Sequence, residues 1–209
     1  MKEYAAGVAG LTLFALLVTA GVAMAAPPGA QDPNWPCEQI KVPQLSLASV
    51  WSGPALDRQA GDWREDPQVV ELVGALAQRR LPINEAQQRI HAFAAQAGEQ
   101  KQPKLLAILS GVFSLLDDER SAVIAGLDRF GARQKELAAN LREESEKLRV
   151  MQADPEAKAS DVATMTEQIS WEAQVFQDRR QAVRYACEVP GKIEQRLFSL
   201  TRAVQGALQ

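Results

Sequence analysis

Side chains able to carry covalent or metal chemistry are scarce in this sequence of 209 residues, which holds one histidine and two cysteines. His91 lies on a predicted short helix, and no serine or cysteine nucleophile motif lies near it in the sequence. A zinc site needs about four nitrogen, sulfur or oxygen ligands. If Cys37 and Cys187 are joined in a disulfide, only His91 and carboxylates remain, so we expect neither a catalytic histidine nor a bound metal.

Two acidic clusters, Asp117–Glu119 and Glu143–Glu146, are the other candidates for chemistry. Paired carboxylates act in glycosidases, and carboxylates also bind calcium. Both clusters lie on continuous helical patterns, where adjacent residues point in different directions, and no feature of the sequence supplies a cleft. Motifs of phosphate-binding loops, serine hydrolases and zinc proteases do not occur. The sequence therefore predicts a non-enzymatic protein without a cofactor.

The first 25 residues have the pattern of a secretory signal peptide. Lys2 precedes an uncharged apolar run, and Ala23-Met24-Ala25 supplies the small-residue motif that a signal peptidase cleaves. We expect residues 1–25 to be removed and the remaining chain to be periplasmic or secreted. The run is also just long enough to cross a bilayer uncut, so a retained anchor stays open as the alternative.

The two cysteines are far apart in the sequence, at Cys37 and Cys187. A redox-active pair usually has the spacing Cys-x-x-Cys, which is absent here. In an exported protein, two distant cysteines predict one structural disulfide.

The stretch from Leu105 to Leu208 predicts two long helices that fold back on each other. Apolar residues recur at alternating steps of three and four, as in a coiled coil. Asp154-Pro155-Glu156 interrupts the first helix, and a short connection of this kind forces the two helices to run antiparallel. We expect the second helix to continue past Pro190 as one element. The predicted facing pairs are Leu148 with Val162, Leu141 with Ile169, and Leu127 with Val183.

Polar residues occupy several positions of this seam, where an ordinary coiled coil holds aliphatic side chains. Such residues lower stability but fix register and pairing, and a hairpin made adhesive for a partner is the functional alternative. The polar seam positions are Arg120, Gln134, Glu144, Glu172 and Arg179.

The chain divides into a signal peptide (1–25), an extended Pro-rich arm (26–66) and a helical part (67–209). The arm is rich in proline yet too apolar for a solvated tail, so we expect it to lie along the helices. Asp66-Pro67 is a helix start, and two short helices precede the long ones. The predicted fold is all-α: a small helical bundle extended by a long antiparallel coiled-coil hairpin, whose outer part (131–174) projects uncovered.

Tryptophans are the candidate binding residues. Trp171 and Val175 fall beside the predicted seam, on the flank of an otherwise charged hairpin, and exposed large apolar side chains mark interaction sites. Trp35 and Trp51 lie in the arm, where they either pack against the helices or line a ligand groove. Burial is the competing interpretation for all of them, since tryptophan is highly buried on average.

These features predict a binding or scaffolding protein. With a net charge of −3 and an isoelectric point near 5.4, no basic field recruits nucleic acid. We expect an accessory or assembly subunit of a bacterial envelope complex with a protein partner, and contact with the membrane only through an uncleaved N-terminal segment. The alternatives are a periplasmic holdase-type chaperone and a small-molecule binding module with a pocket under the arm. A homodimer, in which two hairpins cover each other's flanks, is also open.

Overall fold

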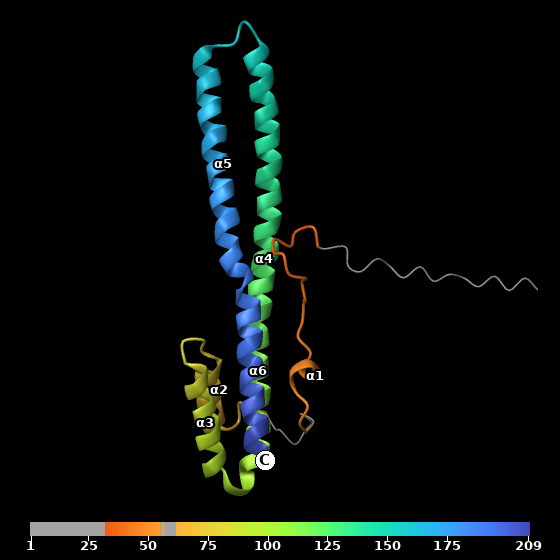
Figure 1. Ribbon diagram of the computed structural model, residues 1–209, viewed down its shortest axis with the longest axis vertical. Coiled ribbons are helices and arrows are strands. Elements are labelled where there is room, and N and C mark those ends of the chain that lie inside the picture. The colour runs from red at the N-terminus through yellow and green to blue at the C-terminus, as the bar shows by residue number, and fades with distance from the viewer. Residues whose placement is uncertain (1–31, 55, 57–61) are drawn as a thin grey trace, which may run out of the picture. The chain divides into compact units, whose positions relative to one another are not determined.

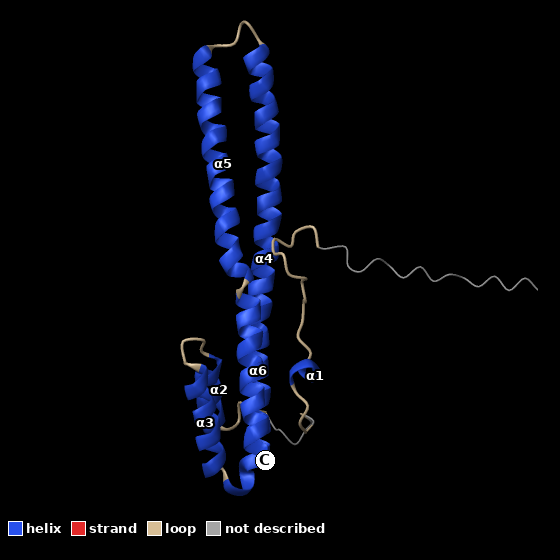
Figure 2. Cartoon of the chain, in the orientation of Figure 1, coloured by secondary structure: helices blue, strands red, loops and turns tan. Residues whose placement is uncertain are grey.

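The structure, a computed structural model of the chain, describes residues 32–54, 56 and 62–209. These residues belong to one compact unit, and the predicted signal peptide lies outside the described residues. The described residues form helices and loops without strands, which confirms the predicted all-α fold (Figures 1 and 2). The elements are α1 (Leu47–Val50), α2 (Pro67–Ala77), α3 (Ile83–Gln96), the 3-10 helix η2 (Gly98–Gln100), α4 (Lys101–Ala153), α5 (Ala159–Cys187) and α6 (Val189–Leu208).

The predicted hairpin consists of α4 and α5. The two helices are joined at Asp154–Lys158, where Pro155 stops the first helix and Asp154 accepts a hydrogen bond of 2.9 Å from the backbone N–H of Glu156. The register is the predicted one. Leu127 and Val183 share an apolar cluster, and the side-chain amide of Gln134 donates to the carbonyl of Phe176 at 3.4 Å.

The second long helix is broken, contrary to the expectation of one continuous element. α5 ends at Cys187, and α6 begins at Val189 with Pro190 in its first turn. Proline lacks a backbone N–H and its ring clashes with the carbonyl four residues earlier, so a helix that meets proline kinks or ends. The two axes are visibly offset at this point in Figure 1.

The main core lies at the end of the unit remote from the hairpin tip. After its first turn, α4 is buried on nearly all sides from Leu105 to Val112, because α2 and α6 both pack against this half of the helix. α3 covers α6, and Trp51 and Trp63 reach the same core from the loops that precede α2. Apolar burial on this scale is the main stabilising term for the bundle.

Two polar side chains fix the short helices on this core. Asp66 caps α2 by accepting hydrogen bonds from the backbone N–H groups of Gln68 and Val69, and it pairs with Lys104 at 2.8 Å. At the C-terminal end of α2, Arg196 of α6 donates to the carbonyls of Leu76 (2.8 Å) and Leu81 (2.9 Å). Burial lowers the pKa of this guanidinium.

Among the described residues, no helix has both the length and the hydropathy needed to cross a membrane.

Candidate protein-binding surfaces

The arm is held across the junction of the hairpin and the bundle by the predicted disulfide. Cys37 and Cys187 are bonded, with their Cα atoms 5.6 Å apart. Around this bond, the Gln39 side chain donates to the carbonyl of Cys187, and the indole N–H of Trp35 donates to the carbonyl of Gln39 at 2.7 Å. These contacts join the arm to the last turn of α5.

Two cations fix the arm further along. Lys41 lies between Asp32 (2.6 Å) and Asp128 of α4 (2.7 Å), and these hydrogen bonds raise the pKa of Lys41. Arg120 of α4, only 2% exposed, donates to Glu194 of α6 at 2.6 Å and to the carbonyl of Val42 at 2.7 Å. Arg120 was predicted to be a polar residue of the helix seam, and it joins the arm to two helices.

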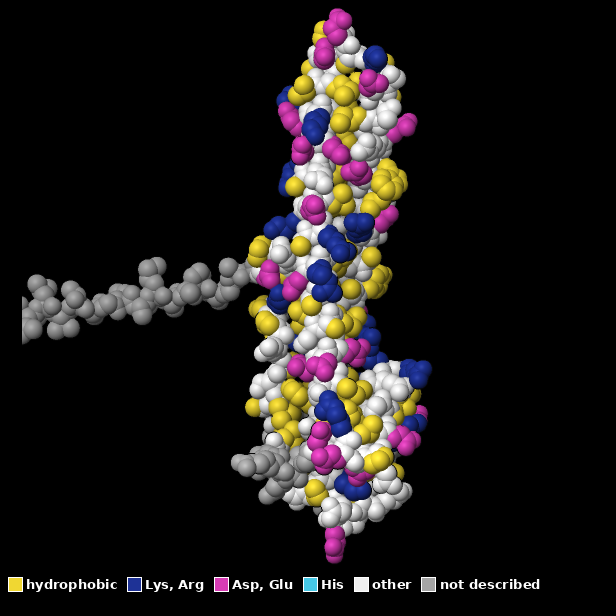
Figure 3. Space-filling model, turned by 180° about the vertical axis from the view of Figure 1, so that it is seen from behind, with side chains coloured by type: hydrophobic (Ala, Val, Ile, Leu, Met, Phe, Trp, Pro, Cys, Tyr) yellow, Lys and Arg dark blue, Asp and Glu magenta, His cyan; other side chains and the backbone are white. Residues whose placement is uncertain are grey.

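A groove of about 700 Å³ lies beneath the crossing arm. Its walls combine aromatic and basic side chains with two acidic ones, and Lys and Arg gather at this middle level of the surface in Figure 3. The aromatic and charged side chains that line it are Trp35, Phe130, Phe176, Lys135, Arg180, Arg184, Glu38 and Glu188. A pocket under the arm was one alternative from the sequence, and this groove is the candidate for it, with Trp35 in its wall.

Trp51 does not lie on this groove. Its ring is buried in the main core, and its indole N–H donates to the carbonyl of Pro54 at 2.7 Å. Its ring is covered by the core and its N–H already has an acceptor within the chain, so we do not include Trp51 in the candidate surface.

Trp171 is exposed on the outer face of α5. Its side chain retains 68% of its accessible surface, while Val175 is half-buried on the same flank. Large aromatic side chains exposed to this degree are characteristic of contact surfaces.

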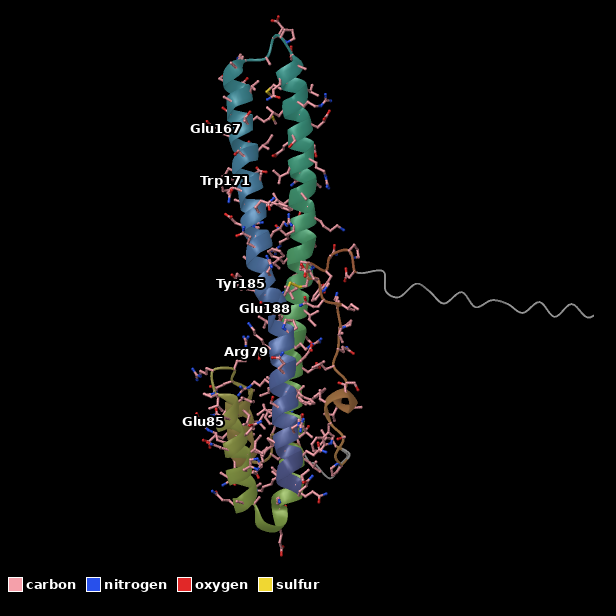
Figure 4. All side chains as sticks on the ribbon, viewed as in Figure 1. Arg79, Glu85, Glu167, Trp171, Tyr185 and Glu188 are labelled. Carbon is pink, nitrogen blue, oxygen red and sulfur yellow. A yellow bond between two sulfur atoms is a disulfide. The ribbon has the colours of Figure 1, made fainter. Side chains whose placement is uncertain are left out.

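Tyr185, with 76% exposure, belongs to the same face. At about 3.6 residues per turn, 14 residues return to within about 40° of the starting direction and advance about 21 Å. Trp171 and Tyr185 therefore lie in one stripe, and Figure 4 shows both on the side of α5 remote from α4. Sequence analysis missed Tyr185, although its separation from Trp171 by two heptads was a signal that could have found it.

Two acidic residues lie beside the aromatics on this face. Glu167 lies one turn before Trp171, and Asp178 lies midway between Trp171 and Tyr185. Both are exposed, and neither forms an ion pair with a described residue. We call the four residues Glu167, Trp171, Asp178 and Tyr185 the α5 stripe.

The three basic residues of α5 are turned away from this stripe. Arg180 and Arg184 line the groove under the arm, and Arg179 falls nearer to α4 than to the outer face by its helical position. Arg179 is exposed, unlike the half-buried seam residues Gln134, Glu144 and Glu172. The outer face of α5 is therefore aromatic and acidic, with no cation of its own.

The remaining candidates for chemistry do not gather into a site. His91 is exposed on α3. Within residues 32–54, 56 and 62–209, no three histidine, cysteine or acidic side chains come close enough together to hold a metal ion. No protein-family model, curated protein or solved structure matches the chain.

Proposed function

We propose that this chain is an exported, non-enzymatic scaffolding protein that binds a partner protein on the outer face of α5. The observation that carries the proposal is the exposure of Trp171 on a helix whose opposite side is packed against α4. A tryptophan buries a large apolar area when a partner covers it, and such residues supply most of the binding energy at protein interfaces.

Export is supported by two features. The N-terminal 25 residues carry the signal-peptide pattern, and a disulfide joins residues 150 positions apart in the sequence. Disulfides of this structural kind persist in oxidising compartments. A helical hairpin fastened to a small bundle in the periplasm suits an accessory or assembly subunit of a bacterial envelope complex.

The proposal is tested by cross-linking in the native envelope, followed by purification of the tagged protein. Trp171→Ala should deplete the cross-linked partner and leave helicity and melting temperature unchanged, because the side chain contacts little of its own chain. Val150→Ala, which removes a 58% exposed apolar side chain from the α4 limb, is the matched control and should retain the partner. Equal recovery with both variants would contradict the proposal.

A second candidate function is small-molecule binding under the arm, favoured by the groove with Trp35, Phe130 and Phe176 in its walls. Native mass spectrometry of the exported protein, purified without detergent, should then detect a bound molecule that Trp35→Ala loses and Trp171→Ala retains. A ligand-free spectrum for the wild-type protein would reject this function.

A further inference from the structure

We infer that the partner of the α5 stripe is a cationic amphipathic helix, which presents Lys or Arg residues at seven-residue intervals. This inference rests on the proposed function, since it names the class of partner for the same surface.

The spacing of the stripe indicates a helical partner. Trp171, Asp178 and Tyr185 follow one another at intervals of seven residues, about 10.5 Å along the axis. Two helices packed at a shallow angle repeat their contacts at this interval. A helix lying along α5 therefore meets an aromatic ring, a carboxylate and a second aromatic ring at three equivalent positions of its own sequence.

The charges of the stripe indicate that the partner is basic. Glu167 and Asp178 carry two negative charges along this face, and Arg180 and Arg184 line the groove under the arm instead. A Lys or Arg over the ring of Trp171 would gain a cation–π contact and have the carboxylate of Glu167 one turn away. Seven residues further along the partner helix, a second cation would lie over the carboxylate of Asp178.

A second copy of this chain does not fit the stripe. Two antiparallel copies of α5 that bring Trp171 against Tyr185 also bring Asp178 against Asp178, and parallel copies oppose every acid to itself. Like charges placed opposite each other across an interface are strongly disfavoured. The chain outside the described residues is excluded as well, because its basic residues are only Lys2 and Arg58.

The stripe also sets the length of the partner segment. Glu167 and Tyr185 are 18 residues apart, which is about 27 Å along the helix axis. A partner helix of about 21 residues therefore covers the whole stripe.

The test uses the full exported chain and two synthetic helical peptides of 21 residues. One peptide carries Arg at three positions separated by seven residues on a face of leucines, and the other carries Glu at the same positions. Calorimetry at low and high salt should give at least about tenfold tighter binding of the Arg peptide, with a preference that shrinks as salt screens the charges. Equal affinity for both peptides would overturn the inference.

Neutral variants separate charge from shape. The double variant Glu167→Gln, Asp178→Asn should lose the preference for the Arg peptide. The control Glu143→Gln, Glu156→Gln removes the same number of exposed charges elsewhere on the hairpin and should keep it. If the double variant binds as the wild type does, the inference is wrong.

Failure of the inference can be told from failure of the proposed function. If Trp171→Ala loses the native cross-linked partner but the variant Glu167→Gln, Asp178→Asn retains it, the binding surface stands and its cationic specificity is wrong. Sedimentation that shows a wild-type dimer, dissociated by Trp171→Ala, would identify a second copy as the partner and overturn the inference.

Discussion

The carbonyl of Asn34 lies directly over Gly131, at a point where a Cβ atom on the glycine would be only 1.7 Å from the carbonyl oxygen. The arm and α4 therefore meet backbone to backbone, and no side chain can be accommodated between them. This explains a glycine in the interior of a long helix, where glycine otherwise costs stability relative to alanine.

Gly131→Ala should displace the arm from α4. We expect faster amide exchange in residues 32–42 and a lower melting temperature, because the arm must lift away from its contacts. Gly126→Ala is the control, since its added methyl would meet nothing nearer than an Arg129 nitrogen at 3.9 Å. That variant should gain about 0.5–1 kcal/mol from helix propensity. Unchanged exchange of the arm in Gly131→Ala would contradict this contact.

Removal of the disulfide should free the arm without dissolving the helices. Cys37→Ser is expected to lower the free energy of unfolding by about 2–5 kcal/mol, chiefly because the unfolded chain gains conformational freedom. Limited proteolysis should then cut within residues 38–46 at protease levels that leave the wild type intact, while circular dichroism reports nearly the same helix content. Comparable protease resistance of the two proteins would show that the arm is held without the bond.

The ion pair between Arg120 and Glu194 should matter more than ion pairs on the hairpin surface. Arg120 is buried, so Glu194→Gln leaves a guanidinium without its counter-charge in the interior, although Glu194 itself is 40% exposed. We expect a loss of about 1–3 kcal/mol in chemical denaturation. Glu143→Gln, which breaks an exposed pair with Lys147, should cost much less than Glu194→Gln. Equal losses would refute a special role for Arg120.

Glu144 makes the stability of the hairpin depend on pH. Burial of the Glu144 carboxyl raises its pKa, and the charge of Glu172 and a hydrogen bond with Glu172 raise it further; Lys147 opposes the shift and Glu143 adds to it. Because the folded-state pKa lies above the ordinary value of 4.5, the ionised carboxylate destabilises the fold at neutral pH. This cost disappears as the pH falls through the folded-state pKa towards 4.5.

Glu144→Gln should therefore melt at a higher temperature than the wild type at pH 7, and the difference should vanish near pH 4.5. Glu143→Gln should show the opposite sign at pH 7, because Lys147 lowers the pKa of Glu143. That stabilisation is lost only as the pH falls below about 4.5. A constant difference in melting temperature between Glu144→Gln and the wild type across this range would show that ionisation of Glu144 does not affect the stability of the hairpin.

The sequence predictions that the structure confirms were based on local patterns. The three-and-four spacing predicted the hairpin register found at Leu127 and Val183, and the pair Asp66-Pro67 predicted the start of α2. The break before α6 was missed because the apolar periodicity continues across Pro190, whereas the backbone of the helix does not.

Contacts between distant segments could not be predicted in this way. The pairing of Lys41 with Asp128, and the bond of Arg120 to the carbonyl of Val42, depend on where the arm crosses α4. No periodicity specifies that path, and Trp51 gave no local sign that it reaches the core. Tyr185 differs from these, because its place on the face of Trp171 follows from helical geometry alone.

The most direct test of the binding surface is site-specific photo-cross-linking in the intact cell. A photoreactive amino acid at Gln174 lies between the two aromatics on the outer face of α5, and one at Ala139 is the control at the matching level of α4. We predict a discrete cross-linked product from position 174 that Trp171→Ala removes, and none from position 139. Equal products from both positions, or a product from 174 that survives Trp171→Ala, would contradict binding at this face.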